Sequence, residues 1–168
     1  MKKLYTIWIV PSPSLRKDLE KIISKLAKKY KAPIFEPHMT LLGDTEIDEK
    51  NMIEKAKILA SRLKTFPIEL GEISFSTTYF QSVFVRVDCT AKLMEANLKA
   101  KEIYKRENYV FMPHMSLLYG DQEMTVREKI MTTIKLPKNT KFMVDKIVVV
   151  PSTKDPKEWE HLAEIPLI

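Results

Sequence analysis

Two stretches of the chain repeat a His-x-Thr/Ser pattern in almost the same apolar surroundings. Residues 37–42 read PHMTLL and residues 113–118 read PHMSLL. Successive side chains of a β-strand point to opposite faces, so each stretch would place an imidazole and a hydroxyl side by side on one face. The chain has three histidines, and the two stretches hold two of them. The repeat therefore predicts one chemical device assembled from two distant parts of the chain.

Two imidazoles that face each other across a cleft suit acid–base catalysis at phosphorus. Histidine is the side chain best matched to proton transfer near neutral pH. One ring would take a proton from water while the other gives one to the leaving oxygen. The hydroxyls would donate hydrogen bonds to the phosphate oxygens on which charge builds up. We therefore take His38, Thr40, His114 and Ser116 as catalytic residues.

The residues alone leave open which histidine is the base. As a working hypothesis we assign His114 as the base and His38 as the acid.

Competing chemistries fit the sequence less well. A metal site needs further His, Cys or carboxylate ligands in matching positions. Asp44 and Asp121 follow the two stretches, but His-x-Glu-x-x-His and Cys-x-x-Cys patterns are missing. Neither hydroxyl stands in the Gly-x-Ser-x-Gly turn that presents a serine nucleophile, and no glycine-rich phosphate loop is found. We therefore expect neither a metal ion nor a cofactor.

Composition predicts a globular protein of modest size that attracts anions. A length of 168 residues with 45% hydrophobic and 30% charged residues favours one compact domain over residues 1–168, or two small lobes sharing a core. The net charge of +6 comes mainly from lysine rather than arginine, which favours a small anionic substrate over a long nucleic acid. No apolar run approaches the roughly 20 residues that span a bilayer, so we expect no membrane association.

A single cysteine, Cys89, allows no internal disulfide and makes a reducing cytoplasm the expected location. The basic, apolar N-terminus meets Pro11 and Pro13 too early for a signal peptide, and we interpret it as a first strand. We expect a monomer with no obligate protein partner.

Hydrophobic periodicity predicts strands and helices that alternate in two similar sets. We expect an α+β arrangement, with helices on one side of antiparallel sheets in two lobes. Strands are expected around His38 and His114 and at about 4–10, 68–76, 83–88, 142–150 and 162–167, and helices at about 14–29, 48–63, 91–104 and 125–134.

The paired His-x-Thr/Ser pattern resembles the 2H phosphoesterase superfamily. Within it, the length and the stretches at 80–84 (FQSVF) and 112–120 (MPHMSLLYG) look most like the cyclic phosphodiesterases, which act on nucleoside 2′,3′-cyclic phosphates and ADP-ribose 1″,2″-cyclic phosphate. The resemblance covers essentially the whole chain. It implies a bilobal, LigT-like α+β fold with two antiparallel sheets that line a central cleft and helices packed outside. It also implies metal-free hydrolysis that leaves a 2′-phosphate from a 2′,3′-cyclic substrate.

Four further residues are candidates for substrate binding. Tyr119 matches by position a family tyrosine that lies against the substrate. Phe80 and Gln81 would wall the nucleobase side of the cleft, since aromatic faces stack on any base, although packing in a hairpin explains them equally well. Trp8 would border the cleft, with a buried position in the first strand as the alternative.

Two other functions stay open. One is an enzyme of the same superfamily that processes RNA 3′ ends or 2′–5′ linkages, which would need a longer basic track. The other is a binding module that grips phosphate without turnover, which would need no second proton-transfer group. Outside the site, we expect Trp159 to serve packing and His161 to lie at the surface.

Overall fold

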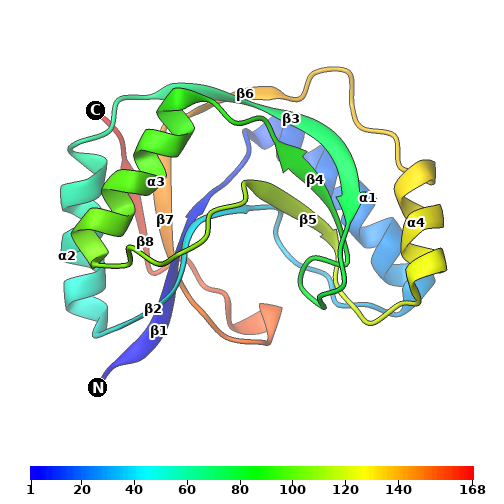
Figure 1. The fold of residues 1–168 in the computed structure, drawn as a ribbon, viewed down its shortest axis with the longest axis horizontal. Coiled ribbons are helices and arrows are strands. Elements are labelled where there is room, and N and C mark those ends of the chain that lie inside the picture. The colour runs from blue at the N-terminus through cyan, green and yellow to red at the C-terminus, as the bar shows by residue number, and fades with distance from the viewer.

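The computed structural model describes all 168 residues, and strands and helices alternate along it (Figure 1). The elements are β1 (Lys3–Ile9), α1 (Pro13–Tyr30), β2 (Met39–Ile47), α2 (Glu49–Ala60), β3 (Phe66–Phe75), β4 (Val83–Val87), α3 (Ala91–Tyr104), β5 (His114–Leu118), α4 (Met124–Thr133), β6 (Lys141–Val144), β7 (Lys146–Pro151), the short 3-10 helix η1 (Pro156–Glu158) and β8 (Ala163–Pro166).

The strands form one antiparallel sheet of eight in the order β6-β3-β4-β5-β2-β1-β7-β8. We expected two separate sheets; instead, two groups of four strands meet at β2 and β5. Met39 opposite Met115 is the single residue pair of that junction. A junction of one pair lets the two groups diverge, and the sheet curls between them (Figure 1).

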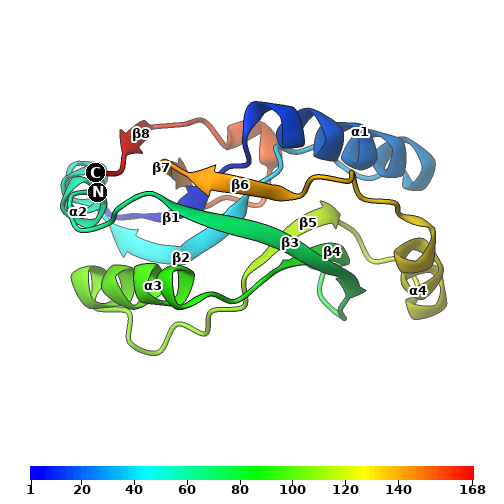
Figure 2. The ribbon, with the colours of Figure 1, turned by 90° about the horizontal axis from the view of Figure 1, so that it is seen from above.

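The helices pack against the sheet and enclose the main core. In Figures 1 and 2, α2 and α3 lie beside the half that contains β1, β2, β7 and β8, and α1 and α4 lie beside the half that contains β3, β4 and β5. Residues of all four helices join one cluster of 35 buried hydrophobic side chains. None of these helices combines the length and the apolar character that crossing a bilayer demands.

Strand alternation separates this core from the opposite face of the sheet. On β1, Tyr5, Ile7 and Ile9 belong to the main core, whereas Thr6 and Trp8 line a cleft on the other face. Trp8 forms a separate small cluster there with Val148 and Val150 of β7. The alternation of side chains along β1 therefore directs each of them either into the main core or toward the cleft.

Most expected elements occur close to their predicted bounds, and the helix over 91–104 matches α3. The single strand expected over 142–150 is wrong. It is two strands, β6 and β7, separated by Asp145; β6 pairs with β3 at one edge of the sheet, and β7 pairs with β1 near the other. β6 buries alternate residues and β7 buries four apolar residues in a row, so apolar residues continue past the break and conceal it.

Candidate active site

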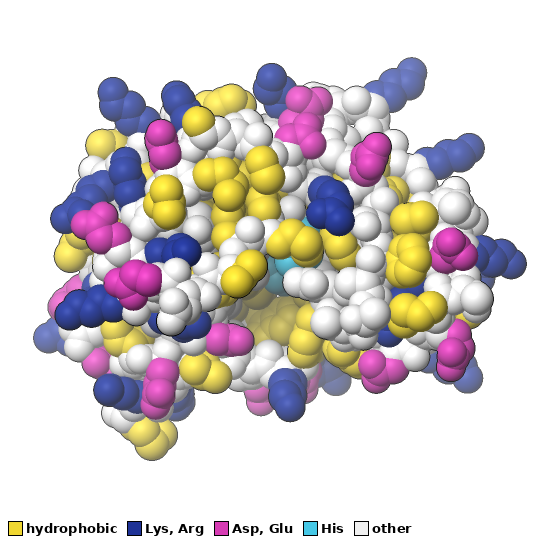
Figure 3. Space-filling model, in the orientation of Figure 1, with side chains coloured by type: hydrophobic (Ala, Val, Ile, Leu, Met, Phe, Trp, Pro, Cys, Tyr) yellow, Lys and Arg dark blue, Asp and Glu magenta, His cyan; other side chains and the backbone are white.

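A cleft of about 500 Å³ opens on the face of the sheet opposite the main core. Figure 3 shows a hollow near the centre of one face, with a histidine side chain visible in it and hydrophobic side chains around it. The four catalytic and four substrate-binding residues predicted from the sequence all line this cleft: Trp8, His38, Thr40, Phe80, Gln81, His114, Ser116 and Tyr119.

The register of β2 and β5 brings the two motifs together. Continuing the single pair of this junction by one residue on each side sets His38 opposite Ser116 and Thr40 opposite His114. Each imidazole therefore neighbours the hydroxyl of the other motif. The two histidines become diagonal neighbours beside this junction, and both line the cleft.

The two imidazoles are held in the same way. Nδ1 of His38 lies 2.7 Å from the carbonyl oxygen of Glu36, and Nδ1 of His114 lies 2.8 Å from that of Met112. A carbonyl oxygen only accepts, so Nδ1 carries the proton in both rings and donates it. Nε2 of each histidine is then the nitrogen left to exchange a proton in the cleft.

Burial lowers the pKa of both histidines. It brings the pKa of His38 to about 4, against the opposing effect of the hydrogen bond to Glu36, and the nearby His114 and His161 lower it further. The pKa of His114 is lowered by burial and also by the cation of Arg86, which faces it across the β4–β5 pair. Both rings therefore favour the neutral form at pH 7.

Aromatic side chains enclose the ring of His38. Trp8 stacks on it, and Trp159 and Phe35 present ring edges at centroid distances of 5.7 and 6.5 Å. Trp8 is 2% exposed, so it is both the buried strand residue and the cleft wall that the sequence offered as alternatives. The indole N–H of Trp8 is buried and has no hydrogen-bond partner.

A further aromatic group lies at the end of the cleft beyond Ser116. Tyr119 is buried and stacks on Phe35 at 3.8 Å, while Phe80 and Trp159 approach it edge-on at 5.1 and 6.0 Å. Burial raises the pKa of Tyr119, which keeps its phenol neutral. Phe80 is 37% exposed and therefore presents a face to solvent.

The hydroxyl of Ser116 is engaged within the protein. It donates a hydrogen bond of 2.7 Å to the carbonyl oxygen of Phe80. To donate to a phosphate oxygen, as the sequence analysis expects, this hydroxyl must turn away from that carbonyl. The same bond ties the second motif to the loop that carries Phe80 and Gln81.

Arg127 of α4 fixes that loop from behind. Its buried guanidinium donates to the carbonyl oxygens of Ser76 and Thr78 at 2.7 and 2.9 Å, and to those of Gly120 and Gln122 at 3.0 and 2.7 Å. One side chain thereby joins the segment before Phe80 to the turn after β5. This role is not predictable from the sequence, because an arginine in an amphipathic helix ordinarily points to solvent.

The third histidine belongs to a charged network next to Trp8. His161 lies 2.8 Å from Glu36 through Nε2 and 2.7 Å from Glu164 through Nδ1, and Arg16 lies 3.1 Å from Glu36. His161 was expected at the surface; it is instead 22% exposed and held between two carboxylates. Glu36 is also the residue whose carbonyl holds His38, so the network supports the site from outside the cleft.

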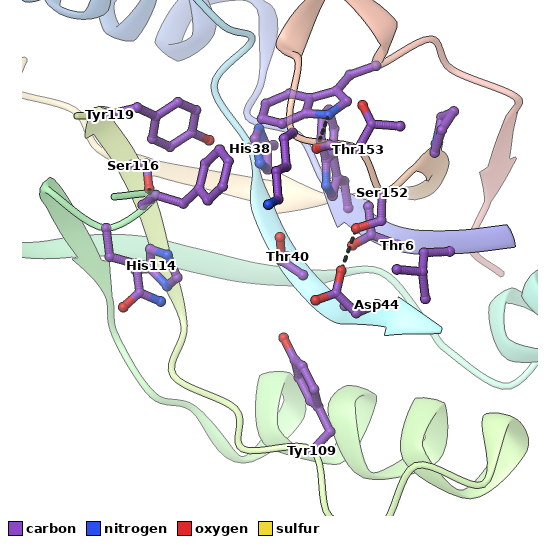
Figure 4. Close-up of a pocket in the computed structure, with 18 residues that line it drawn as sticks. Thr6, His38, Thr40, Asp44, Tyr109, His114, Ser116, Tyr119, Ser152 and Thr153 are labelled. Atoms are coloured by element: carbon purple, nitrogen blue, oxygen red, sulfur yellow. Dashed lines mark hydrogen bonds between the residues drawn. The ribbon is translucent and has the colours of Figure 1, made fainter. Parts of the chain in front are cut away.

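The cleft has a second, polar end whose residues were not among those predicted from the sequence. Figure 4 shows Asp44, Ser152, Thr6 and Tyr109 on the side of Thr40 away from Ser116. Lys154 also lines the cleft and is the only lysine or arginine that does. Thr6 could have been found from its place two residues before Trp8, on the same face of β1. No group of three or more His, Cys, Asp or Glu side chains in the structure could hold a metal ion.

Solved structures share this fold. A structure of E. coli LigT in complex with 3′-AMP matches with a TM-score of 0.71 and 15% identity over 99% of both chains. A Thermus thermophilus protein matches with a TM-score of 0.66 and 16% identity over 98% of this chain and 97% of its own. The chain therefore has the fold of LigT.

Comparison of sequences identifies the family to which the chain belongs. A family model described as cyclic phosphodiesterase-like protein matches residues 4–167. A cyclic phosphodiesterase of Arabidopsis thaliana is 30% identical over 132 residues, which cover 76% of this chain and 70% of that protein. The chain belongs to the cyclic phosphodiesterase-like family of the 2H phosphoesterases, which confirms the resemblance seen in its motifs, and it is an enzyme of that class.

Proposed function

We propose that this protein hydrolyses nucleoside 2′,3′-cyclic phosphates to 2′-phosphates by acid–base catalysis between His38 and His114, with no metal ion. One observation carries the proposal. A single strand pair sets two imidazoles diagonally across one cleft, each fixed through Nδ1 to a main-chain carbonyl. Binding alone would need no such matched pair, whereas hydrolysis needs a proton acceptor and a proton donor on opposite sides of phosphorus.

The reaction follows from this arrangement. The cyclic phosphate lies between the rings, and Thr40 and Ser116 donate hydrogen bonds to its non-bridging oxygens. Nε2 of one histidine takes a proton from a water molecule as the water oxygen bonds to phosphorus. The bond from phosphorus to the ribose 3′-oxygen breaks, and Nε2 of the other histidine gives its proton to that oxygen. The product is the 2′-phosphomonoester.

The pKa of His38 suggests a role for this ring. The base must be neutral before reaction, and burial brings the pKa of His38 to about 4. The acid must be protonated, and the anionic phosphate raises the pKa of both rings toward that form. We therefore assign His38 as the base and His114 as the acid, the reverse of our working assignment from sequence.

The aromatic end of the cleft supports a nucleotide as the substrate. Tyr119, Phe80 and Trp159 offer ring faces and edges on one side of the catalytic pair. Aromatic side chains stack on any base, at about 1–3 kcal/mol per base. The base of the cyclic nucleotide is accordingly placed at this end, with Gln81 beside it.

The test is turnover of adenosine 2′,3′-cyclic phosphate in the presence of EDTA, followed by phosphorus NMR. The expected result is complete conversion to the 2′-phosphate at a rate that EDTA does not change. Loss of turnover with EDTA, or a product with phosphate on the 3′-oxygen, contradicts the proposed mechanism. Binding of the nucleotide without any hydrolysis contradicts the proposed function.

A further inference from the structure

The segment that leads into the first motif is not held by its backbone. Residues 33–38 lie between α1 and β2, outside any regular element, and make no hydrogen bond from main chain to main chain. Pro33 and Pro37 have no N–H to donate. Yet Nδ1 of His38 donates its hydrogen bond to a carbonyl oxygen of this segment, that of Glu36. The position of that carbonyl must therefore be set by side chains.

The second motif differs, because strand pairing holds the segment before it. Nδ1 of His114 donates to the carbonyl oxygen of Met112. The next carbonyl, that of Pro113, accepts a hydrogen bond of 3.0 Å from the main-chain N–H of Val87, in β4. The two imidazoles thus receive the same contact at Nδ1, but only the second receives it from a backbone that a neighbouring strand fixes.

The carboxylate of Glu36 is anchored beside the cleft. It is 18% exposed, and its Oε2 lies 2.8 Å from Nε2 of His161. Its Oε1 is buried and accepts no hydrogen bond; Nη1 of Arg16 lies 3.1 Å away and balances the negative charge. His161 is therefore the single hydrogen-bond donor to this carboxylate.

His161 is itself fixed at its other ring nitrogen. Nδ1 lies 2.7 Å from Oε1 of Glu164 in β8, and Glu164 pairs with Lys146 of β7 at 2.5 Å. Hydrogen bonds from Lys146 and from His161 lower the pKa of Glu164 to about 2, so this carboxylate is ionised. An ionised carboxylate only accepts, and both nitrogens of His161 therefore donate. One imidazole thus connects Glu36 to the paired strands β7 and β8.

We propose that Glu36 and His161 together position His38 for proton transfer, by fixing the main-chain carbonyl to which Nδ1 of His38 donates. Both are positioning residues, because neither lines the cleft. A fixed carbonyl keeps the proton of the neutral ring on Nδ1, and Nε2 is then the nitrogen that can take a proton. This role rests on the proposed function, in which His38 exchanges a proton through Nε2.

The first measurement is kcat and KM for adenosine 2′,3′-cyclic phosphate in Glu36→Ala, in His161→Ala and in the double variant. Each single change should lower kcat about tenfold and leave KM nearly unchanged, because a misplaced ring loses the geometry for proton transfer and not the substrate contacts. The double variant should be no worse than the poorer single variant, because both changes remove the same contact.

Two further variants make the kinetics specific to this contact. Glu36→Gln should lose less than Glu36→Ala, because the amide oxygen of glutamine still accepts from Nε2 of His161. Glu160→Ala is the matched control and should leave kcat unchanged, since Glu160 is exposed and adjoins His161 only in the sequence.

The second measurement reads the tautomer of His38 by NMR, in protein that contains ¹⁵N-labelled histidine. The chain has three histidines, so each ring can be assigned. His38 should carry its proton on Nδ1 in the wild-type protein, and Glu36→Ala should show a mixture with the Nε2–H form. His114 should keep the Nδ1–H form in both proteins, because β4 holds the segment before it.

Wild-type kcat in both alanine variants, measured in folded protein, overturns this inference, and so does a loss confined to KM. Losses that add in the double variant overturn it too, since the two residues would then act separately. A lower kcat with unchanged His38 signals has the same consequence, because the loss would have another cause. If the wild-type protein hydrolyses no cyclic nucleotide, the proposed function is wrong, and the tautomer of His38 still decides this inference.

Discussion

The indole ring of Trp8 lies flat against the imidazole of His38, with ring centroids 3.6 Å apart and ring planes 9° apart. Trp8 comes from β1 and stands opposite Thr40 in the β1–β2 pairing. The contact fixes the plane in which the imidazole lies. The hydrogen bond to the carbonyl oxygen of Glu36 fixes the orientation of the ring within that plane. Trp8 is therefore a positioning residue, in addition to bordering the cleft.

Replacing Trp8 tests this role. Trp8→Leu should lower kcat about tenfold or more, because a misplaced catalytic ring loses the geometry for proton transfer. Trp8→Phe keeps a flat aromatic surface and should lose less. Stopped-flow or steady-state rates, measured where both variants are folded, check the order. A loss that appears in KM alone would assign Trp8 to substrate binding instead.

The pH dependence of activity separates the two histidines. A bell-shaped profile is expected, because one ring must be neutral and the other protonated. His38→Ala should abolish the acidic limb, since the base is gone, and His114→Ala should abolish the alkaline limb. The measurement is the residual rate of each variant between pH 5 and 9. If His38→Ala instead lost the alkaline limb and His114→Ala lost the acidic limb, His114 would be the base.

The lowered pKa of His38 also links stability to pH. An unfolded histidine binds its proton near pH 6.5, whereas folded His38 binds it only near pH 4. The unfolded state binds more protons between these values, so the free energy of unfolding should fall as the pH drops from 6.5 to 4. The contribution of His38 is roughly 2 to 3 kcal/mol and is fully present above pH 6.5.

Urea unfolding at pH 7 and pH 4.5 checks this contribution, with His38→Gln as the comparison. The wild-type protein should lose more stability than the variant, because glutamine does not titrate. Equal losses in the two proteins would show that His38 has an ordinary pKa in the folded state.

Arg127 should matter for both stability and substrate binding. Arg127→Met keeps the length of the side chain but leaves four carbonyl oxygens without their donor. The free energy of unfolding should fall by about 3 kcal/mol, as expected when several hydrogen bonds to a charged group are lost. KM should rise because Phe80 and Gln81 are no longer held. Arg62→Met, at an exposed position, serves as the control and should change neither quantity.

Much of the site could be predicted because its pattern is local. The alternation of a strand places His38 with Thr40 and His114 with Ser116, and the sequence shows both pairs. The adjacency of β2 and β5 depends on one long-range pair, and no local pattern reports it. For the same reason the sequence led to two sheets instead of one.

The polar end and the supporting network escaped prediction for other physical reasons. Asp44 reaches the cleft through an irregular backbone that departs from the alternation used to assign faces. His161 contacts Glu36 although the two residues lie 125 positions apart in the sequence. Such contacts are set by tertiary packing, and the residue types alone contain no signal for them.

The most direct test of the account is the rate of hydrolysis of adenosine 2′,3′-cyclic phosphate by His38→Ala, by His114→Ala and by the double variant. Each single variant should lower kcat by about 10²–10⁴. The double variant should be little worse than the poorer single variant, because the two rings act as one unit. A single variant that folds normally and retains more than about a tenth of the wild-type rate would contradict the two-histidine mechanism.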